Sequence, residues 1–279
     1  MIDLHTHTTA LDGRCTPAEL VARASAAGVT VLSVTDHDTV AGCTAAAAAC
    51  RDAGVEFLPG IEITAVREAS DIHVLGYFID VESAALLEFL AEQRRRRVDR
   101  VREMIARLAR FGIPLDADAI LAPGLADSSK SVGRPWIAAA LVAGGHVADK
   151  NEAFDRYLAR GRPAFVPRTG AAPAEVIARI HDAHGLASIA HPGLMRRDEW
   201  LGEFAAAGVD AFEVFHPDHD LDARSRYLAF ARDFGVLVTG GSDYHADQSH
   251  GAPTPGSVSL PREHYERLVR LKPDTTAQK

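Results

Sequence analysis

The sequence predicts an α/β fold, either a βα-type barrel or an open sheet, interrupted by a helical insertion. The first observation is that four strand-like apolar runs alternate with helices or turns within the first 80 residues. The second is that this alternation stops near Asp80 and resumes after Arg168. The third is that polar side chains, histidines above all, follow directly after the apolar runs.

Composition narrows the class of protein. The chain has 279 residues, 47% of them hydrophobic, which is enough for a full core. Its formal net charge of -8 gives no global field for long nucleic acid, so a phosphate ligand needs local basic residues or metal ions. No apolar run is as long as a membrane span and the start has no signal-peptide pattern, so we expect a cytoplasmic protein away from membranes. Cys15, Cys43 and Cys50 form no CxxC motif, and we expect reduced thiols.

Residues 1–80 are expected to form the first part of the barrel. The chain opens on a short strand ending in His5 and His7, whose i, i+2 spacing puts both imidazoles on one face. A helix follows, with Thr16 as N-cap, Pro17 at the first helical position and Glu19 three residues after the cap. The further elements expected here are a strand at 29–34, a helix ending near 53, and strands at 56–64 and 72–77.

Residues 81–168 are expected to form an inserted helical subdomain. The stretch 83–111 is helical in pattern and contains four consecutive arginines, 94–97, and little strand signal follows it. Residues 169–279 are expected to form the second part of the barrel. There the predicted helices are 173–184, 198–207 and 222–234, and each leads into a strand, at 186–190, 209–215 and 236–240.

Polar side chains at or just beyond the strand ends form a candidate metal site. They are His5, His7, Asp12, His37, Glu62, His73, His191, His216, Asp243 and His245. In βα barrels the carboxyl ends of the strands share one face, where active sites lie. Imidazoles and carboxylates packed together without a cation would be very unfavourable, and mixed N and O ligands suit Zn, Mn or Fe. Six other histidines are expected to be exposed in helices or loops: His146, His181, His184, His219, His250 and His264.

Several short motifs resemble, in order, those of the PHP (polymerase and histidinol phosphatase) family of the amidohydrolase superfamily. They are His5-x-His7, Thr35-Asp36-His37-Asp38, Gly60-x-Glu62, His73, Ala190-His191-Pro192 and Gly241-Ser242-Asp243-x-His245. Within the family, the helical insertion and the motifs Gly133-Arg134-Pro135 and Phe215-His216-Pro217 resemble the nucleoside 3',5'-bisphosphate phosphatases and the related 5'-to-3' exoribonucleases. The resemblance implies a distorted seven-stranded (β/α)7 barrel, the PHP fold, with an inserted small helical domain.

The resemblance also implies a trinuclear metal site. Carried over residue by residue, the first ion is held by His5, His7, Glu62 and Asp243, the second by Glu62, His73 and His191, and the third by Asp12, His37 and His245. Asp12 stands where some family members have histidine, and a carboxylate favours a harder ion. We therefore expect three Mn²⁺ ions, with Zn²⁺ or Fe²⁺ as alternatives.

The implied reaction is hydrolysis of the 3'-phosphate of a nucleoside 3',5'-bisphosphate by metal-bound hydroxide, giving the 5'-monophosphate and inorganic phosphate. His216 is the candidate for donating a hydrogen bond to the phosphate or for protonating the leaving group. The candidate substrate-binding residues are Asp99, Arg100, Arg102, Arg134, Pro135 and His216. Alternatives are a 5'-to-3' exonuclease on short RNA, a histidinol-phosphate phosphatase, which would need acidic surroundings for an amine, and a non-catalytic PHP module. No protein partner is expected.

Overall fold

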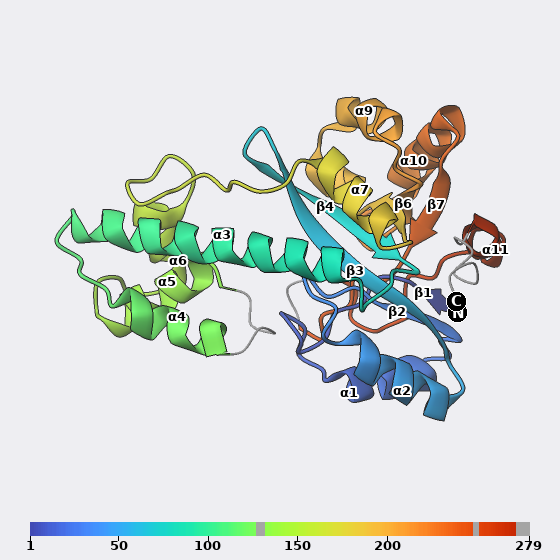
Figure 1. The fold of residues 1–279 in the computed structure, drawn as a ribbon, viewed down its shortest axis with the longest axis horizontal. Helices are drawn as coiled ribbons and strands as arrows, with labels where there is room; N and C mark the ends of the chain where they lie inside the picture. Colours follow the sequence, from blue (N-terminus) through green and yellow to red (C-terminus); the bar gives the residue numbers. More distant parts are fainter. Residues whose placement is uncertain (127–131, 248–250, 272–279) are drawn as a thin grey trace. The chain divides into compact units, whose positions relative to one another are not determined.

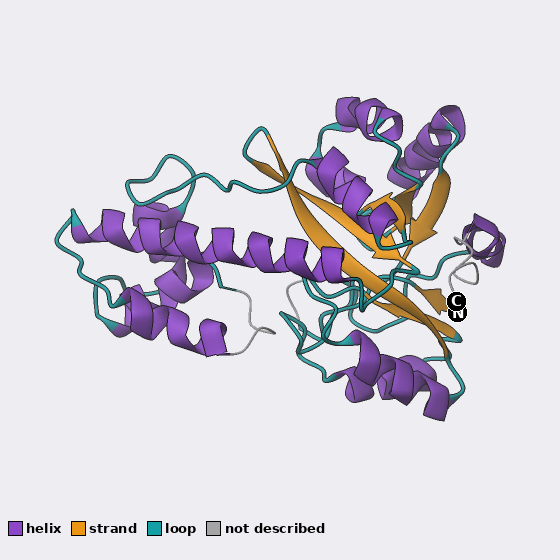
Figure 2. Ribbon diagram, in the orientation of Figure 1, coloured by secondary structure: helices purple, strands orange, loops and turns teal. Residues whose placement is uncertain are grey.

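The computed structural model describes residues 1–126, 132–247 and 251–271. The chain forms two compact units. The larger comprises Met1–Arg67, Asp71–Leu90 and Ala171–Lys279, and the smaller comprises Glu68–Ser70 and Ala91–Gly170. Figure 2 shows that the strands gather in the larger unit, whereas helices and loops make up the body of the smaller one.

The larger unit is built on a seven-stranded sheet whose strands lie in sequence order, from β1 to β7. The strands are β1 (Ile2–Asp3), β2 (Val31–Val34), β3 (Glu56–Arg67), β4 (Ser70–Tyr77), β5 (Leu186–Ile189), β6 (Ala211–Phe215) and β7 (Leu237–Gly240). The two ends of the sheet meet, because the Leu4 N–H donates to the Gly240 carbonyl at 3.3 Å and Thr6 forms a parallel bridge with Tyr244. The predicted α/β fold, a distorted seven-stranded barrel, is thereby confirmed.

One strand, β4, distorts the barrel. β1, β2 and β3 pair in parallel, as do β5, β6 and β7, but β4 pairs with β5 antiparallel, with Tyr77 opposite Leu186. The reversal occurs at Glu68 and Ala69, which connect β3 to β4 and have φ values of 49° and 59°. Positive φ at both positions of a two-residue connection is the geometry of a tight hairpin turn.

Helices cover the barrel on two sides (Figure 1). Those of the larger unit are α1 (Pro17–Ala26), α2 (Cys43–Ala53), α7 (Pro173–Asp182), α8 (Pro192–Met195), η2 (Asp198–Trp200), α9 (Leu201–Ala206), α10 (Leu221–Phe234) and α11 (Arg262–Leu271). The predicted capping box of α1 is present, since the Thr16 side chain accepts from the Glu19 N–H and Glu19 bonds back to the Thr16 N–H. Neither α8 nor α11 was predicted from the sequence.

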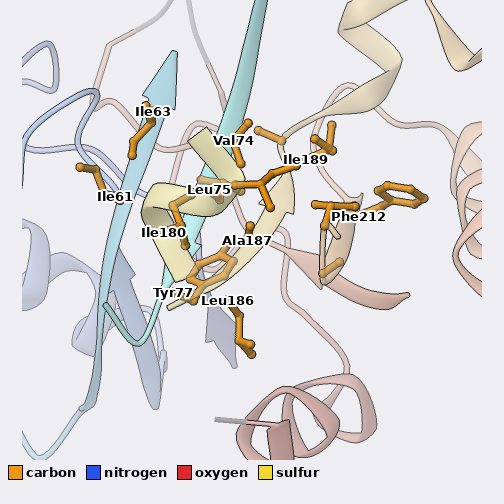
Figure 3. Close-up of a cluster of buried hydrophobic side chains, with 14 of the residues drawn as sticks. Ile61, Ile63, Val74, Leu75, Tyr77, Ile180, Leu186, Ala187, Ile189 and Phe212 are labelled. Carbon is orange, nitrogen blue, oxygen red and sulfur yellow. The ribbon is translucent and has the colours of Figure 1, made fainter. Parts of the chain in front are cut away.

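The sheet and helices of the larger unit enclose an apolar core. Figure 3 shows its centre, where Ile61 and Ile63 of β3, Val74 and Leu75 of β4, and Phe212 of β6 lie close to side chains of α7 and β5. A second cluster lies under α1 and α2, and it includes two of the three cysteines. All three cysteines are buried free thiols, as predicted.

The smaller unit has an apolar core of its own. Its helices are α4 (Ala117–Ala126), α5 (Arg134–Ala143), α6 (Lys150–Ala153), the π-helical turn η1 (Phe154–Leu158) and the greater part of α3 (Ala84–Ala109). Met104 and Leu108 of α3 pack with Leu121 of α4 and Ile137 of α5. Within the described residues, no helix of either unit has the length and apolar character needed to span a membrane.

Candidate metal centre

The nine predicted ligands come together at one end of the barrel, around Glu62 of β3. The parallel strands have their carboxyl ends here, but β4 is antiparallel, so His73 lies near the beginning of its strand and not at the carboxyl end expected from the sequence. Oε2 of Glu62 lies 3.2 Å from Nε2 of His5 and 3.2 Å from Nδ1 of His37. Oε1 lies 2.8 Å from Nδ1 of His73 and 3.2 Å from Nε2 of His191. A single buried carboxylate therefore faces imidazoles carried by, or following, four different strands.

The other two carboxylates of the set flank Glu62. Oδ1 of Asp243 lies 3.0 Å from Nε2 of His7 and 3.3 Å from Nε2 of His5. Asp12, which is 44% exposed, lies 3.7 to 3.8 Å from ring nitrogens of His7, His37 and His245. Three groups have ligand atoms close enough to share an ion: His7, Asp12, His37 and His245; His5, His7 and Asp243; and His37, Glu62 and His73.

Close backbone approach makes this convergence possible. His5 follows β1, and Gly241 follows β7 on the neighbouring edge. A Cβ atom on Gly241 would lie 2.3 Å from the His5 backbone nitrogen, closer than real Cβ contacts allow. Only glycine lets the two segments lie side by side here. The sequence Gly240-Gly241 therefore positions the imidazole of His5 against Asp243.

Burial and the neighbouring charges shift the pKa values of the cluster residues in opposite directions. Burial alone would raise the pKa of the Glu62 carboxyl, but the imidazoles of His37 and His73 outweigh it and hold this pKa well below its usual value. Burial lowers the pKa of His37 to about 3. Burial also acts to lower the pKa of His245, but the nearby carboxylates of Asp12 and Asp243 raise it to about 9.

The cluster fits a group of divalent cations. Among the residues that the structure describes, both ring nitrogens of His7 and the Nδ1 atoms of His37 and His73 are buried without a well-directed hydrogen bond, although carboxylate oxygens lie 2.8 to 3.8 Å from them. Buried polar atoms are normally hydrogen-bonded, and leaving them without a partner is unfavourable. Neutral imidazole nitrogens and ionised carboxylates are the donors that first-row divalent metals accept, and a bound cation would satisfy these atoms.

Comparison with known proteins identifies the family. The model of the PHP domain matches residues 3–119. The 3',5'-nucleoside bisphosphate phosphatase of Chromobacterium violaceum is 34% identical over 281 residues, which cover 96% of this chain and 98% of that protein. This chain belongs to the PHP family. The 5'-3' exoribonuclease of Haemophilus influenzae is also similar, with 37% identity over 87% of this chain and 89% of that protein.

A solved structure of a similar protein has the same fold. It is a protein of Bifidobacterium adolescentis proposed to be a metal-dependent phosphoesterase, with a TM-score of 0.80, 32% identity, and coverage of 99% of this chain and 98% of that one. Together with the clustered ligands, these likenesses make this chain a metal-dependent phosphoesterase of the PHP family.

His216 lies beside the PHP ligand cluster and is fully buried. The backbone N–H of Asp218 donates to its Nδ1 at 3.2 Å, which leaves the ring proton on Nε2. Nε2 lies 3.3 Å from Oδ2 of Asp243. The proton on Nε2 is thus directed to Asp243, and a catalytic role for His216 stays a prediction.

Two residues beside the cluster did not stand out in the sequence. Glu213 lies inside the apolar run of β6 and is fully buried, with its carboxylate against His5 and the His191 backbone. A charged residue inside an otherwise buried strand was the available signal. His219 was predicted to be exposed, and this was wrong: it is 1% exposed, with Nδ1 2.9 Å from the Val214 carbonyl and Nε2 accepting from the Gly193 N–H.

The remaining histidines divide by exposure. His181 and His184 are exposed, as predicted, whereas His146 and His264 are half-buried. His250 lies outside the described residues.

The predicted substrate-binding residues other than His216 lie in the smaller unit. Asp99 is exposed, and its carboxylate lies 3.8 Å from the Arg102 guanidinium. Arg100 is half-buried, and its Nε donates to the Val166 carbonyl at 2.8 Å. This contact gives Arg100 a structural role within the unit, and binding of substrate by these three residues stays a prediction.

Arg134 and Pro135 lie at the beginning of α5. The helix begins at Arg134, and Pro135 lies in its first turn. The Arg134 guanidinium lies 5.6 Å from the centre of the Phe154 ring, within the range of a cation–π contact. Pro135 is exposed, and the N-cap Gly133 supplies no side-chain hydrogen bond to the first turn.

Proposed function

We propose that the protein hydrolyses the 3'-phosphate of nucleoside 3',5'-bisphosphates and releases the 5'-monophosphate and inorganic phosphate. The observation that carries this proposal is the similarity to the bisphosphate phosphatase of C. violaceum, which extends over 96% of this chain and so includes both units. The clustered histidines and carboxylates support it, because they suit a phosphoesterase that depends on metal ions.

The nine clustered residues would hold the metal ions. We propose three Mn²⁺ ions, the first on His5, His7, Glu62 and Asp243, the second on Glu62, His73 and His191, and the third on Asp12, His37 and His245. When bound, such ions supply a water molecule of lowered pKa and neutralise the oxygens of the phosphate. The carboxylate of Asp12 supports the harder Mn²⁺ over Zn²⁺ at its position.

The chain's own residues would orient this site. His216 donates to Oδ2 of Asp243, so we propose that it holds this carboxylate with Oδ1 facing His5 and His7. The Asp36 carboxylate accepts the Thr8 backbone N–H at 2.6 Å and fixes the loop after His7. These contacts would keep the ligands in place while substrate and product exchange.

We propose that the second phosphate of the substrate binds the smaller unit. Arg134 offers a guanidinium, which can hold a phosphate through two parallel hydrogen bonds. Its position in the first turn of α5 adds backbone N–H groups and the positive end of the helix dipole. Discrimination between a bisphosphate and a simple monoester would then depend on Arg134.

A phosphate-release screen tests the proposal. The purified protein with Mn²⁺ would be assayed on adenosine 3',5'-bisphosphate, 5'-AMP, an aryl phosphate, histidinol phosphate and a 5'-phosphorylated RNA of a few nucleotides. The expected result is the highest kcat/KM on the bisphosphate, with 5'-AMP as the product. A preference for histidinol phosphate, or a folded metal-loaded protein inactive on every substrate, would contradict it.

A second candidate function is 5'-to-3' exonuclease action on short RNA. The observation that favours it is the 37% identity to the exoribonuclease of H. influenzae. The two activities release different products from RNA, because an exonuclease cleaves phosphodiesters and yields mononucleotides. Chromatography of the products of the same RNA distinguishes them: nucleoside 5'-monophosphates indicate the exonuclease, and an intact oligonucleotide indicates the monoesterase alone.

A further inference from the structure

Glu213 occupies a position in which a charged side chain is hard to accommodate. It lies in β6 between Phe212 and Val214, which are buried, and is itself 0% exposed. Burying a carboxylate without partners is very unfavourable, so its hydrogen bonds decide whether it can remain there. Glu213 has two: Oε1 lies 2.9 Å from Nδ1 of His5, and Oε2 accepts the backbone N–H of His191 at 2.7 Å.

The first hydrogen bond selects the protonation of His5. An ionised carboxylate has only acceptor atoms, so Nδ1 of His5 must carry the proton that it shares with Glu213. Nε2 is then the atom that is free to bind a metal ion, and it lies 3.2 Å from Glu62 and 3.3 Å from Asp243. A carboxylate behind an imidazole commonly fixes the tautomer and raises the basicity of a metal ligand.

The second hydrogen bond holds a strained turn. His191 has φ 27° and ψ 60°, in a region that non-glycine residues rarely occupy. Its N–H is bound by Glu213, and two residues later the Gly193 N–H is bound by His219 at 3.1 Å. His219 donates from Nδ1 to the Val214 carbonyl. Both acceptors thus come from β6 and the turn after it, and together they hold the His191 turn.

We propose that Glu213 is a positioning residue that sets two metal ligands at once, the imidazole of His5 after β1 and the turn of His191 after β5. It thereby controls the affinity of the barrel for its metal ions. The proposal rests on the proposed ligand set and not on the identity of the substrate. Metal binding measured without substrate therefore tests it independently of the proposed reaction.

Glu213→Gln is the sharpest variant, because it keeps the shape of the side chain and removes one acceptor. An amide has one acceptor oxygen, while both the His5 Nδ1–H and the His191 N–H need an acceptor. If the oxygen serves His191, the amide NH₂ faces His5 and favours the tautomer with the proton on Nε2. If it serves His5, the His191 N–H faces a second donor. Either arrangement disturbs one ligand.

The experiment is a calorimetric titration of metal-free wild type and variant with Mn²⁺ and with Zn²⁺. We expect Glu213→Gln to weaken binding roughly 10- to 100-fold, the range for outer partners of metal ligands. The control is Glu56→Gln, at an exposed residue of β3 whose carboxylate accepts from the Tyr265 hydroxyl and lies outside the cluster. Its metal affinity should equal that of wild type.

A second readout separates positioning from simple loss of stability. In Zn²⁺-loaded, ¹⁵N-histidine-labelled wild type, we expect a protected Nδ1–H signal from His5, absent or strongly shifted in Glu213→Gln. Wild-type metal affinity in a folded Glu213→Gln protein would overturn the proposal, as would an equal loss in Glu56→Gln. If Glu213→Gln does not fold, Glu213→Asp is titrated in its place, where unchanged affinity overturns the proposal and weakened affinity with the altered His5 signal supports it.

Discussion

The two units of the chain bury different kinds of side chain. Among the described residues, the larger unit buries acidic side chains, histidines, serines and threonines within its barrel, whereas the buried residues of the smaller unit are apolar except for Gln93. The arginines of the smaller unit stay nearer its surface. Arg94 and Arg107 donate to the carbonyls of Gly124 and Phe165. The smaller unit is therefore organised as an ordinary folded core with a cationic exterior.

The difference indicates that the larger unit gives up some stability for its metal site. Burying ionisable groups lowers stability unless they are paired, and pairing them seldom recovers more than an apolar core would. The larger unit accepts this disadvantage around Glu62, where buried imidazole nitrogens lack well-directed hydrogen bonds. The smaller unit has no such disadvantage, so its charged residues can change with the substrate while its core is preserved. Substitutions in the two units should accordingly affect different quantities.

The largest effect is expected at the centre of the barrel. Glu62→Gln leaves the surrounding imidazoles with one acceptor oxygen in place of two, and removing one partner from buried charges has an effect of about 3–5 kcal/mol. We expect kcat/KM for phosphate release to fall at least about 100-fold, with metal content reduced. The matched control is Glu152→Gln, on the smaller unit, which should retain activity. Full activity of Glu62→Gln under limiting Mn²⁺ would remove Glu62 from the metal site.

The next effect tests the smaller unit as a substrate-binding element. Arg134→Ala should lower kcat/KM on a 3',5'-bisphosphate by about 2–5 kcal/mol of transition-state stabilisation, the scale for one partner of a desolvated charge pair. The loss on an aryl phosphate, which has no second phosphate, should be much smaller. An equal loss on both substrates would assign Arg134 to the reacting phosphate or to the fold, and no loss on either would leave it without a role in binding.

A third effect concerns how tightly the barrel is packed where its ends meet. Gly241→Ala places a methyl group against the His5 backbone, so we expect a loss of about 1–3 kcal/mol or more in the free energy of unfolding. Gly202→Ala is the control, since a Cβ there meets Phe234 at an ordinary 3.5 Å in helix α9. Urea unfolding followed by circular dichroism measures both. Equal stability of the two variants would show that the close approach is tolerated.

A smaller effect is expected for a structural arginine of the smaller unit. Arg100→Ala removes the hydrogen bond to the Val166 carbonyl and should reduce stability by about 1 kcal/mol. Arg95→Ala, which loses only a surface ion pair with Glu92, should change stability by less than about 0.5 kcal/mol. Denaturant midpoints measured for both proteins provide the check, and identical midpoints would mean that the Arg100 contact contributes nothing.

The smallest effect is a pH dependence on the outside of the larger unit. His181 lies 2.7 Å from Asp210, and this hydrogen bond raises the pKa of His181 above its usual 6.5. A raised pKa means that the pair stabilises the fold fully below pH 6.5 and loses this contribution as pH rises through the folded-state pKa. His181→Gln should therefore lower the melting temperature more at pH 5.5 than at pH 9. A larger loss at pH 9 would contradict the assignment.

Most of the ligand cluster could be predicted from sequence because most of its members follow apolar runs. His5, His37 and His191 each come directly after, or within a few residues of, a buried strand, and the carboxyl ends of strands meet on one face of a barrel. Glu62 and His73 lie within β3 and β4, and they were identified through motifs that resemble those of the family. Glu213 also lies within its strand, belongs to none of those motifs, and contacts His5 of a segment distant in the sequence. His219 follows a strand by several residues, and only the fold reveals the carbonyl and N–H that enclose it.

The antiparallel direction of β4 could not be predicted from the sequence either. A tight hairpin is usually marked by Asn-Gly or a similar pair, which adopts positive φ easily. Here the connection is Glu68-Ala69, which carries no such signal although both residues have positive φ. The helix boundaries were more accessible, since Thr16, Pro17 and Glu19 identify the start of α1 by local chemistry alone. Features fixed by neighbouring residues could be predicted, whereas those fixed by distant contacts required the structure.

The antiparallel pairing of β4 with β5 has a consequence for how the protein is made. Tyr77 and Leu186 are partners in this pair, yet all of the smaller unit lies between β4 and β5 in the chain apart from the Glu68–Ser70 tip of the hairpin. A ribosome therefore releases the helical unit before it releases the strands that complete the barrel. Until then the first four strands have two unpaired edges, β1 and β4, while the helical unit can fold from its own local contacts. The barrel can therefore close only after the whole helical unit has been synthesised.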